Sequence, residues 1–139
     1  MNLAAATGNA TQLVFCRENV DPDVVSRMLD LAPTESVKVG EPAERLNGAR
    51  YISHLGTWKL DLPKANTDQT VEEQIGLWVE LLRPKSLSLK ELRGMGYCPY
   101  LDCKAEAGSL SLCIEPDLLA SLGELHVSLS IWLYEQPRA

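Results

Sequence analysis

The sequence predicts an α+β fold: a two-layer sandwich in which helices pack on one face of a mixed, mainly antiparallel sheet of about five strands. Residues 125–133 alternate apolar and polar side chains with the period of a β-strand. Residues 71–82 instead place apolar side chains at helical spacing behind a capping box. Strand-like and helix-like segments follow in the order β-α-β-α-(α)-β-β-α-β. Adjacent strands beside single crossovers are typical of such a mixed sheet.

The start of the chain predicts a strand followed by a helix. Residues 1–10 are small and polar, and we expect a flexible N-terminus there. Residues 11–139 fit a single domain, and residues 11–17 within it are rich in β-formers. Asp21 is a good N-cap, and the proline after it suits a first helical turn. The helix that follows carries an apolar stripe made of Val24, Val25, Met28 and Leu29.

The next segment predicts a loop and then a second strand. Residues 34–50 hold two glycines and a proline among charged residues, so we expect a loop with at most a short irregular strand around residues 37–39. Residues 51–62 predict one long strand. Its inward face by period two consists of Ile52, His54, Gly56, Trp58 and Leu60, so the apolar alternation is imperfect.

Two helices are predicted in the middle of the chain. Thr70 and Glu73 have the spacing of a capping box, and the helix behind them runs to about Arg83, where Pro84 ends it. Its stripe contains Val71, Ile75, Trp78 and Leu82. Residues 86–93 predict a further short helix.

The last third predicts a hairpin, a short helix and a closing strand. Residues 97–105 and 109–114 are the two strands of the hairpin. Residues 116–122 form the helix, with Gly123 as its C-terminal signal. We expect the strand over residues 125–133 near the sheet centre, with its apolar row facing the helices. The opposite face would carry Ser128, Ser130, Trp132 and Tyr134.

Composition and charge narrow the function. The formal net charge is −6, and the basic residues are scattered, so a nucleic-acid partner is disfavoured and a basic protein partner is weakly favoured. No stretch resembles a membrane span or a secretion signal, so we expect a cytoplasmic protein without a membrane contact.

Common catalytic motifs are missing from the sequence. It contains no phosphate-binding, zinc-protease or nucleophile-elbow motif, so we expect no catalytic residue, cofactor or metal. His54 and His126 each lie within a predicted strand and have no adjacent partner. The four cysteines, whose spacing is not that of a zinc site, are expected to be reduced thiols. An enzyme using Cys98 or Cys103 with a histidine is the least favoured hypothesis.

A set of short motifs resembles a known family. The helix at Asp21-Pro22 is followed by Leu-Ala-Pro-Thr at residues 31–34 and by Lys-Val-Gly-Glu at 38–41. Gly-Thr-Trp-Lys-Leu at 56–60 and Leu122-Gly123 before the last strand complete the set. Over about residues 11–134 the chain resembles the bacterial domain-of-unknown-function family 4279. The resemblance implies no established activity and no catalytic residues. Members are similar in size and occurrence to immunity proteins encoded beside bacterial toxins.

The family usually ends its last strand with an acidic residue near a tyrosine. This chain departs from that pattern, because the stretch reads Ile131-Trp132-Leu133-Tyr134.

These observations favour a cytosolic protein-binding module, most specifically an immunity protein that binds and neutralises a cognate bacterial toxin. The partner would be a basic toxin or effector domain encoded nearby. The alternative is a small-molecule-binding or regulatory domain, which could act as a dimer and would use the open face of its sheet. For partner binding we expect the loop residues Glu41, Glu44 and Arg45, with Trp132 and Tyr134 as the less favoured site.

Overall fold

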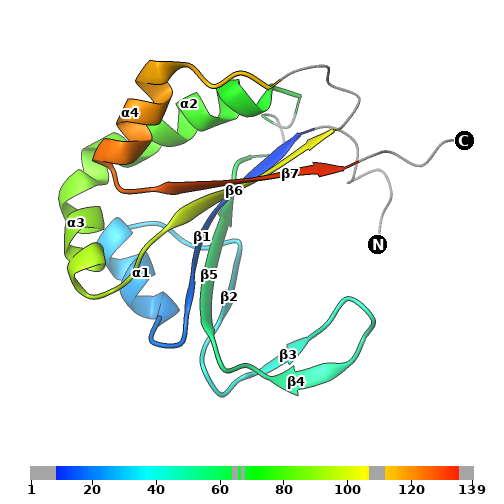
Figure 1. Cartoon of the computed structure of the whole chain (residues 1–139). Helices are drawn as coiled ribbons and strands as arrows, with labels where there is room; N and C mark the ends of the chain where they lie inside the picture. Colours follow the sequence, from blue (N-terminus) through cyan, green and yellow to red (C-terminus); the bar gives the residue numbers. More distant parts are fainter. Residues whose placement is uncertain (1–8, 64–65, 67, 107–111, 135–139) are drawn as a thin grey trace, which may run out of the picture.

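The computed structural model describes residues 9–63, 66, 68–106 and 112–134, and a five-stranded sheet runs through them (Figure 1). Its strand order is β2-β5-β1-β6-β7. The pairs β2–β5, β5–β1 and β1–β6 are antiparallel. β6 and β7 are parallel, because the chain crosses over through α4 between them. The strands are β1 (Ala10–Arg17), β2 (Glu35–Val37), β5 (Gly56–Asp61), β6 (Tyr100–Glu106) and β7 (Ser128–Tyr134).

Helices cover one face of this sheet, which confirms the α+β sandwich with a mixed, mostly antiparallel sheet (Figure 1). They are α1 (Pro22–Leu29), α2 (Val71–Leu82), the 3-10 turn η3 (Arg83–Lys85), α3 (Ser86–Gly94) and α4 (Pro116–Glu124). The core between the two layers includes Phe15, Trp58 and Trp78, all fully buried. The rings of Phe15 and Trp58 meet edge to face, with centroids 5.6 Å apart.

The helix starts follow the local signals. The Asp21 carboxylate accepts a hydrogen bond of 3.0 Å from the backbone N–H of Asp23, so it caps α1. The Thr70 hydroxyl accepts from the Glu73 N–H at 3.1 Å, and the Glu73 carboxylate accepts from the Thr70 N–H at 3.4 Å. The backbone N–H groups of Thr70 and Glu73 at the start of α2 are therefore both hydrogen-bonded, and the predicted capping box is confirmed.

The end of α4 differs from the prediction. The helix continues through Gly123, and His126 takes the left-handed conformation with φ 56°. Val127 N–H donates to the Leu122 carbonyl at 3.0 Å and His126 N–H donates to Gly123 at 3.1 Å, which is a Schellman motif. The reversal places β7 at Ser128, three residues later than the predicted strand start.

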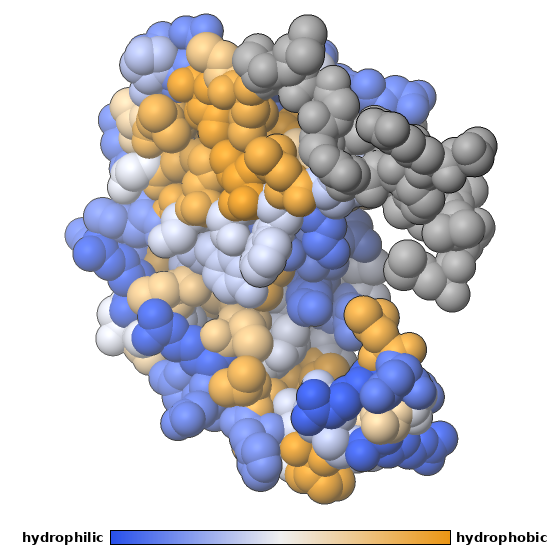
Figure 2. All heavy atoms as spheres, turned by 45° about the vertical axis from the view of Figure 1, so that its right-hand side comes forward, coloured by the Kyte–Doolittle hydropathy of each residue, from blue (hydrophilic) through white to orange (hydrophobic). Residues whose placement is uncertain are grey.

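The predicted loop and long strand between residues 34 and 62 are correct only in part. β2 overlaps the short strand expected around residues 37–39, and β5 occupies the second half of the predicted long strand. Pro42–Glu44 (β3) and Arg50–Ile52 (β4) form a separate two-stranded sheet, and the chain then turns before β5. The Ser53 hydroxyl makes that turn, because it donates to the Leu55 carbonyl at 2.6 Å and accepts from the Leu55 N–H at 3.3 Å. We call residues 42–52 the hairpin arm; it projects from the sheet and forms a separate lobe in the space-filling view (Figures 1 and 2).

The C-terminal third corrects two further expectations. Residues 109–111 of the predicted hairpin lie outside the described residues, and residues 112–114 form no strand. β1 pairs with one side of β6 and β7 pairs with the other. Among the strands that the structure describes, β7 is thus at the edge of the sheet and not at its centre. Leu129 packs against the core as expected, whereas Ile131 and Leu133 are 37% and 68% exposed.

The ends of the predicted domain can be compared only in part. Residues 1–8 lie outside the described residues, and Ala10 already belongs to β1. Among the described helices, none is long and apolar enough to cross a membrane.

Candidate functional site

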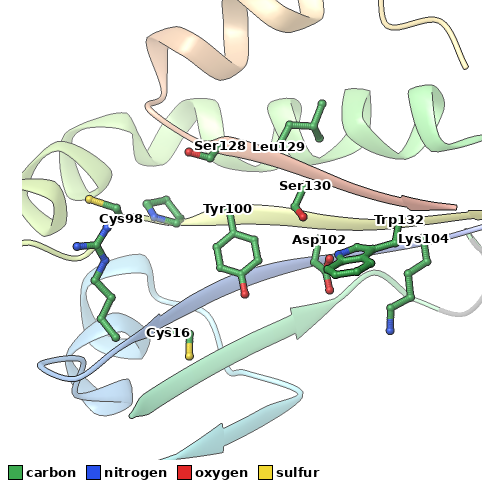
Figure 3. A pocket seen from close by; sticks show the side chains of 11 residues that line it. Cys16, Cys98, Tyr100, Asp102, Lys104, Ser128, Leu129, Ser130 and Trp132 are labelled. Atoms are coloured by element: carbon green, nitrogen blue, oxygen red, sulfur yellow. The ribbon is translucent and has the colours of Figure 1, made fainter.

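The face of the sheet that the helices leave open carries a shallow trough of about 660 Å³ (Figure 3). Residues of β1, β6 and β7 and of the segment before β6 line it. They are Cys16, Arg17, Cys98, Pro99, Tyr100, Asp102, Lys104, Ser128, Leu129, Ser130 and Trp132.

Strand register builds the trough. Tyr100 lies beside Ser128, Asp102 beside Ser130 and Lys104 beside Trp132 in the parallel β6–β7 ladder. Because alternate residues of a strand point to the same face, successive members of the β6 row stand about 7 Å apart. Figure 3 shows Tyr100 and Cys16 directed to the same side of the sheet from adjacent strands, with Lys104 next to Trp132 at the other end.

The central carboxylate of the trough lacks a donor. Asp102 Oδ1 is buried and accepts no hydrogen bond from the part of the chain that the structure describes. Burial raises the pKa of the Tyr100 phenol above its ordinary value, and nearby Cys16 and Asp102 add to the rise. The phenol therefore stays protonated at neutral pH and can donate a hydrogen bond. Arg17 and Lys104 supply positive charge elsewhere along the trough.

This arrangement suits recognition of a polar group better than nucleophilic chemistry. A ligand amine or amide N–H would supply the donor that Asp102 lacks, and an anionic group would meet Arg17 or Lys104. Neither histidine lines the trough. Cys103 lies in the core on the opposite face, where burial raises the pKa of its thiol to about 12. Among the described residues, no group of three or more histidine, cysteine or acidic side chains could hold a metal ion.

The hairpin arm is the second candidate surface. Arg45 and Ala49 close it with an N–H to carbonyl bond of 2.8 Å, and Gly48 N–H donates to Arg45 at 2.9 Å. Gly48 has φ 85°, the left-handed conformation that a three-residue hairpin loop requires and that glycine adopts without strain. The Asn47 side chain also accepts from Ala49 N–H at 3.0 Å. The turn is thus well defined by local bonds.

The side chains of the arm are exposed. Leu46 at the tip is fully exposed, and Tyr51 and Ile52 are 40% and 55% exposed. The Arg45 guanidinium lies 4.7 Å from the centre of the Tyr51 ring, a cation–π contact within the arm. Glu44 lies opposite Arg50 in the ladder.

A family model described as Domain of unknown function (DUF4279) covers residues 7–136. The chain belongs to this family. The match includes every strand and helix from β1 to β7, so the resemblance carried by the short motifs is confirmed. No curated protein and no solved structure matches the chain significantly.

The residues predicted for partner binding occupy two separate places in this DUF4279 domain. Glu41 stands at the base of the arm and Glu44 and Arg45 lie on it, all exposed. Trp132 lines the trough on the open face, whereas Tyr134 ends β7 and is not among the lining residues.

Sequence reasoning missed the trough residues of β6 and the tip of the arm. Tyr100, Asp102 and Lys104 alternate with buried Leu101 and Cys103, so period two could have found that row. Their neighbours on β1 and β7 could not be found in that way, because strand order is not encoded locally.

Proposed function

We propose that this DUF4279 protein is a cytosolic protein-binding module, and most specifically an immunity protein that neutralises a basic toxin or effector domain encoded nearby. The observation that carries the proposal is the hairpin arm with a fully exposed Leu46 at its tip. A single exposed leucine on a broad surface is ordinary. Here it is displayed on a projecting arm together with Tyr51 and Ile52, and apolar and aromatic side chains of this kind provide most of the affinity in protein interfaces.

Charge supports a basic partner. The chain carries a net charge of −6, and Glu41 and Glu44 stand exposed beside the apolar tip. Arg45 and Arg50 also lie on the arm, so Glu41 and Glu44 act together with the acidic remainder of the molecule in attracting a basic surface. Complementary charge of this kind speeds association more than it tightens the final complex.

Co-expression with the product of the neighbouring gene tests the proposal directly. The two proteins should purify as a complex, and cells that express the neighbour should survive only when this chain is present. If no complex forms and no protection follows, the proposal is wrong.

The role of the arm is tested by Leu46→Asp. This variant should weaken the complex at least tenfold, because it places a charge at the apolar tip that the partner would bury. Leu87→Asp is the matched control, since Leu87 is 76% exposed on α3, away from the arm. Equal weakening by both variants would contradict the assignment to the arm.

A second candidate is a small-molecule-binding or regulatory domain that uses the trough, and the unpaired Asp102 oxygen favours it. The ligand would be a zwitterionic or amine-bearing molecule, with Tyr100 and Trp132 as aromatic contacts. A thermal-shift screen of amines and amino acids should then give a hit that Asp102→Asn removes and that Asp117→Asn on α4 retains. A screen without hits would count against this candidate.

A further inference from the structure

The two edges of the sheet differ in how they are protected. β2 at one edge has three residues and begins with Glu35, features that discourage pairing with another strand. β7 at the other edge has seven residues and contains neither a charged residue nor a proline. Natural proteins seldom leave a long uncharged edge strand of this kind open, because it invites another strand to pair with it.

Apolar side chains gather along the β7 edge. Ile131, Trp132 and Leu133 are 37%, 61% and 68% exposed, on both faces of the strand. Leu119 of the neighbouring α4 is half exposed. The space-filling view shows a continuous apolar patch over the part of the molecule where α4 and β7 lie (Figure 2). An apolar patch that continues from an edge strand onto a helix is typical of a protein interface.

We propose that two copies of this chain pair through β7 in antiparallel orientation, with a two-fold axis at Ile131, to form one continuous sheet. The strand is self-complementary about that residue. Leu129 would lie opposite the partner's Leu133 on the helix side, and Ser130 opposite the partner's Trp132 on the open face. A slip by one residue would exchange the two faces, so the alternation itself selects the register.

The absence of charged side chains along β7 permits a second copy as the occupant. Two chains of net charge −6 repel each other, and contact is least costly where no charged side chain lies. The stretch from Ser128 to Leu133 carries no charge. A second copy would therefore bring only uncharged side chains of the same strand against it.

Pairing would complete the trough without blocking the arm. Trp132 lines the trough, so a second Trp132 beside Ser130 would add an outer wall from the partner. The arm connects β2 and β5, at the opposite edge of the sheet. The dimer is therefore independent of the proposed toxin-binding role, and each can fail without the other.

Light scattering during size-exclusion chromatography, at tens of micromolar protein, is the first test. Wild type should elute as a dimer, and Leu133→Lys should be monomeric with an unchanged far-ultraviolet circular dichroism spectrum. Leu87→Lys, a matched exposed leucine on α3, should remain dimeric. A monomeric wild type would overturn the proposal, and so would a Leu133→Lys variant that stays dimeric.

Cross-linking tests the register. Directly opposite residues of antiparallel strands have Cα atoms about 4.5–5.5 Å apart, within disulfide range. Cys98 and Cys113 are exposed, so both are first replaced by serine. In that background Ile131→Cys should form a covalent dimer on mild oxidation. Leu133→Cys should not, because two copies of residue 133 would stand roughly 13 Å apart. The reverse pattern would overturn the two-fold axis at Ile131.

Discussion

At the scale of single residues, the four thiols occupy three different environments. Cys98 and Cys113 are exposed, Cys16 is half-buried and Cys103 is fully buried in the core. The Cys16 sulfur lies 3.5 Å from the Thr57 hydroxyl. Since the thiolate is the reactive form, burial and a raised pKa both slow alkylation.

Thiol labelling should therefore proceed in a fixed order. In native protein at pH 8, iodoacetamide should label Cys98 and Cys113 first, Cys16 slowly and Cys103 only after unfolding. Mass spectrometry of the unfolded protein, without reductant, should show four labels. A native disulfide between Cys98 and Cys103 would contradict this expectation and the proposal of a cytosolic protein with it.

The Cys103 thiol also makes stability depend on pH. Burial raises its pKa from 9.0 to about 12, so the folded state holds this proton more tightly than the unfolded state. The resulting stabilisation is complete below pH 9 and is lost as pH rises toward 12. In urea titrations between pH 7 and 11, the free energy of unfolding should fall less with rising pH for Cys103→Ala than for Cys98→Ala. The raised pKa of Tyr100 also lowers stability at high pH, but it does so in both variants. The difference between the two variants therefore reports the Cys103 thiol.

Charge reversal at the base and side of the arm should slow partner binding. Glu41→Lys with Glu44→Lys raises the net charge by four units, and the association rate should fall roughly tenfold at low salt and less at high salt. Stability should change by about 0.5 kcal/mol or less, because both side chains are exposed.

Surface plasmon resonance at two salt concentrations measures the effect on the rate. The control is Glu80→Lys with Glu91→Lys, which makes the same charge change on α2 and α3. Equal slowing by the control would assign the effect to net charge alone. If the arm variant binds normally while Trp132→Ala abolishes binding without unfolding, the open sheet face is the partner site.

At the scale of elements, Gly56 fixes how β5 passes the end of β1. A Cβ atom at Gly56 would lie 1.7 Å from the Val20 carbonyl oxygen, which is backbone and cannot rotate away. Gly56→Ala should therefore cost roughly 3 kcal/mol of unfolding free energy in urea titration.

Gly76→Ala is the comparison, because Gly76 is in the middle of α2 and its nearest neighbour would be 4.0 Å away. Alanine is the better helix former, so this variant should gain about 0.5–1 kcal/mol. A Gly56→Ala protein as stable as wild type would mean that the Val20 segment moves freely.

Helices were predictable from the sequence where their signals are local. The Asp21 cap, the Thr70–Glu73 capping box and the stripe of α2 each lie within a few residues and need no tertiary partner. The predicted α+β sandwich followed from these elements and from strand alternation. The prediction of one long strand over residues 51–62 failed because β4 and β5 belong to different sheets. The serine turn between them interrupts neither the composition nor the alternation of the sequence strongly enough to mark a break.

Strand position and the trough were not predictable for a related reason. An edge strand and a central strand can share the same alternation, so alternation alone predicts a central position for β7 that the sheet order does not bear out. The predicted binding residues Glu41, Glu44 and Arg45 do lie together, because they are close in sequence. The trough needs Cys16, Asp102 and Ser130 from three strands, and only the register of the folded sheet brings these together.

At the scale of the whole molecule, the arm is separate from the other two candidate surfaces, which adjoin each other along β7. The arm leaves the sheet between β2 and β5, the trough lies on the open face over β1, β6 and β7, and the apolar edge is β7 itself. A molecule with this layout can hold a partner at one edge and a second copy at the other, with the helical layer as the common support.

The arm should therefore be removable without loss of the fold. None of its residues belongs to the hydrophobic core. Its base is already closed, because Ser53 N–H donates to the Glu41 carbonyl at 2.9 Å and Gly40 N–H donates to the Ser53 carbonyl at 2.8 Å. Replacing residues 42–52 with Asn-Gly, the dipeptide preferred in two-residue hairpin turns, joins Glu41 to Ser53 across this pair.

The shortened protein should keep its circular dichroism spectrum, its midpoint of thermal unfolding to within about 3 °C, and its β7-mediated dimer. It should lose the complex with the neighbouring gene product, because the exposed tip and its flanking residues are gone. Unfolding of the shortened protein would mean that the arm supports the sheet. Retention of the complex would place the partner on the open face, where Trp132 and Asp102 lie.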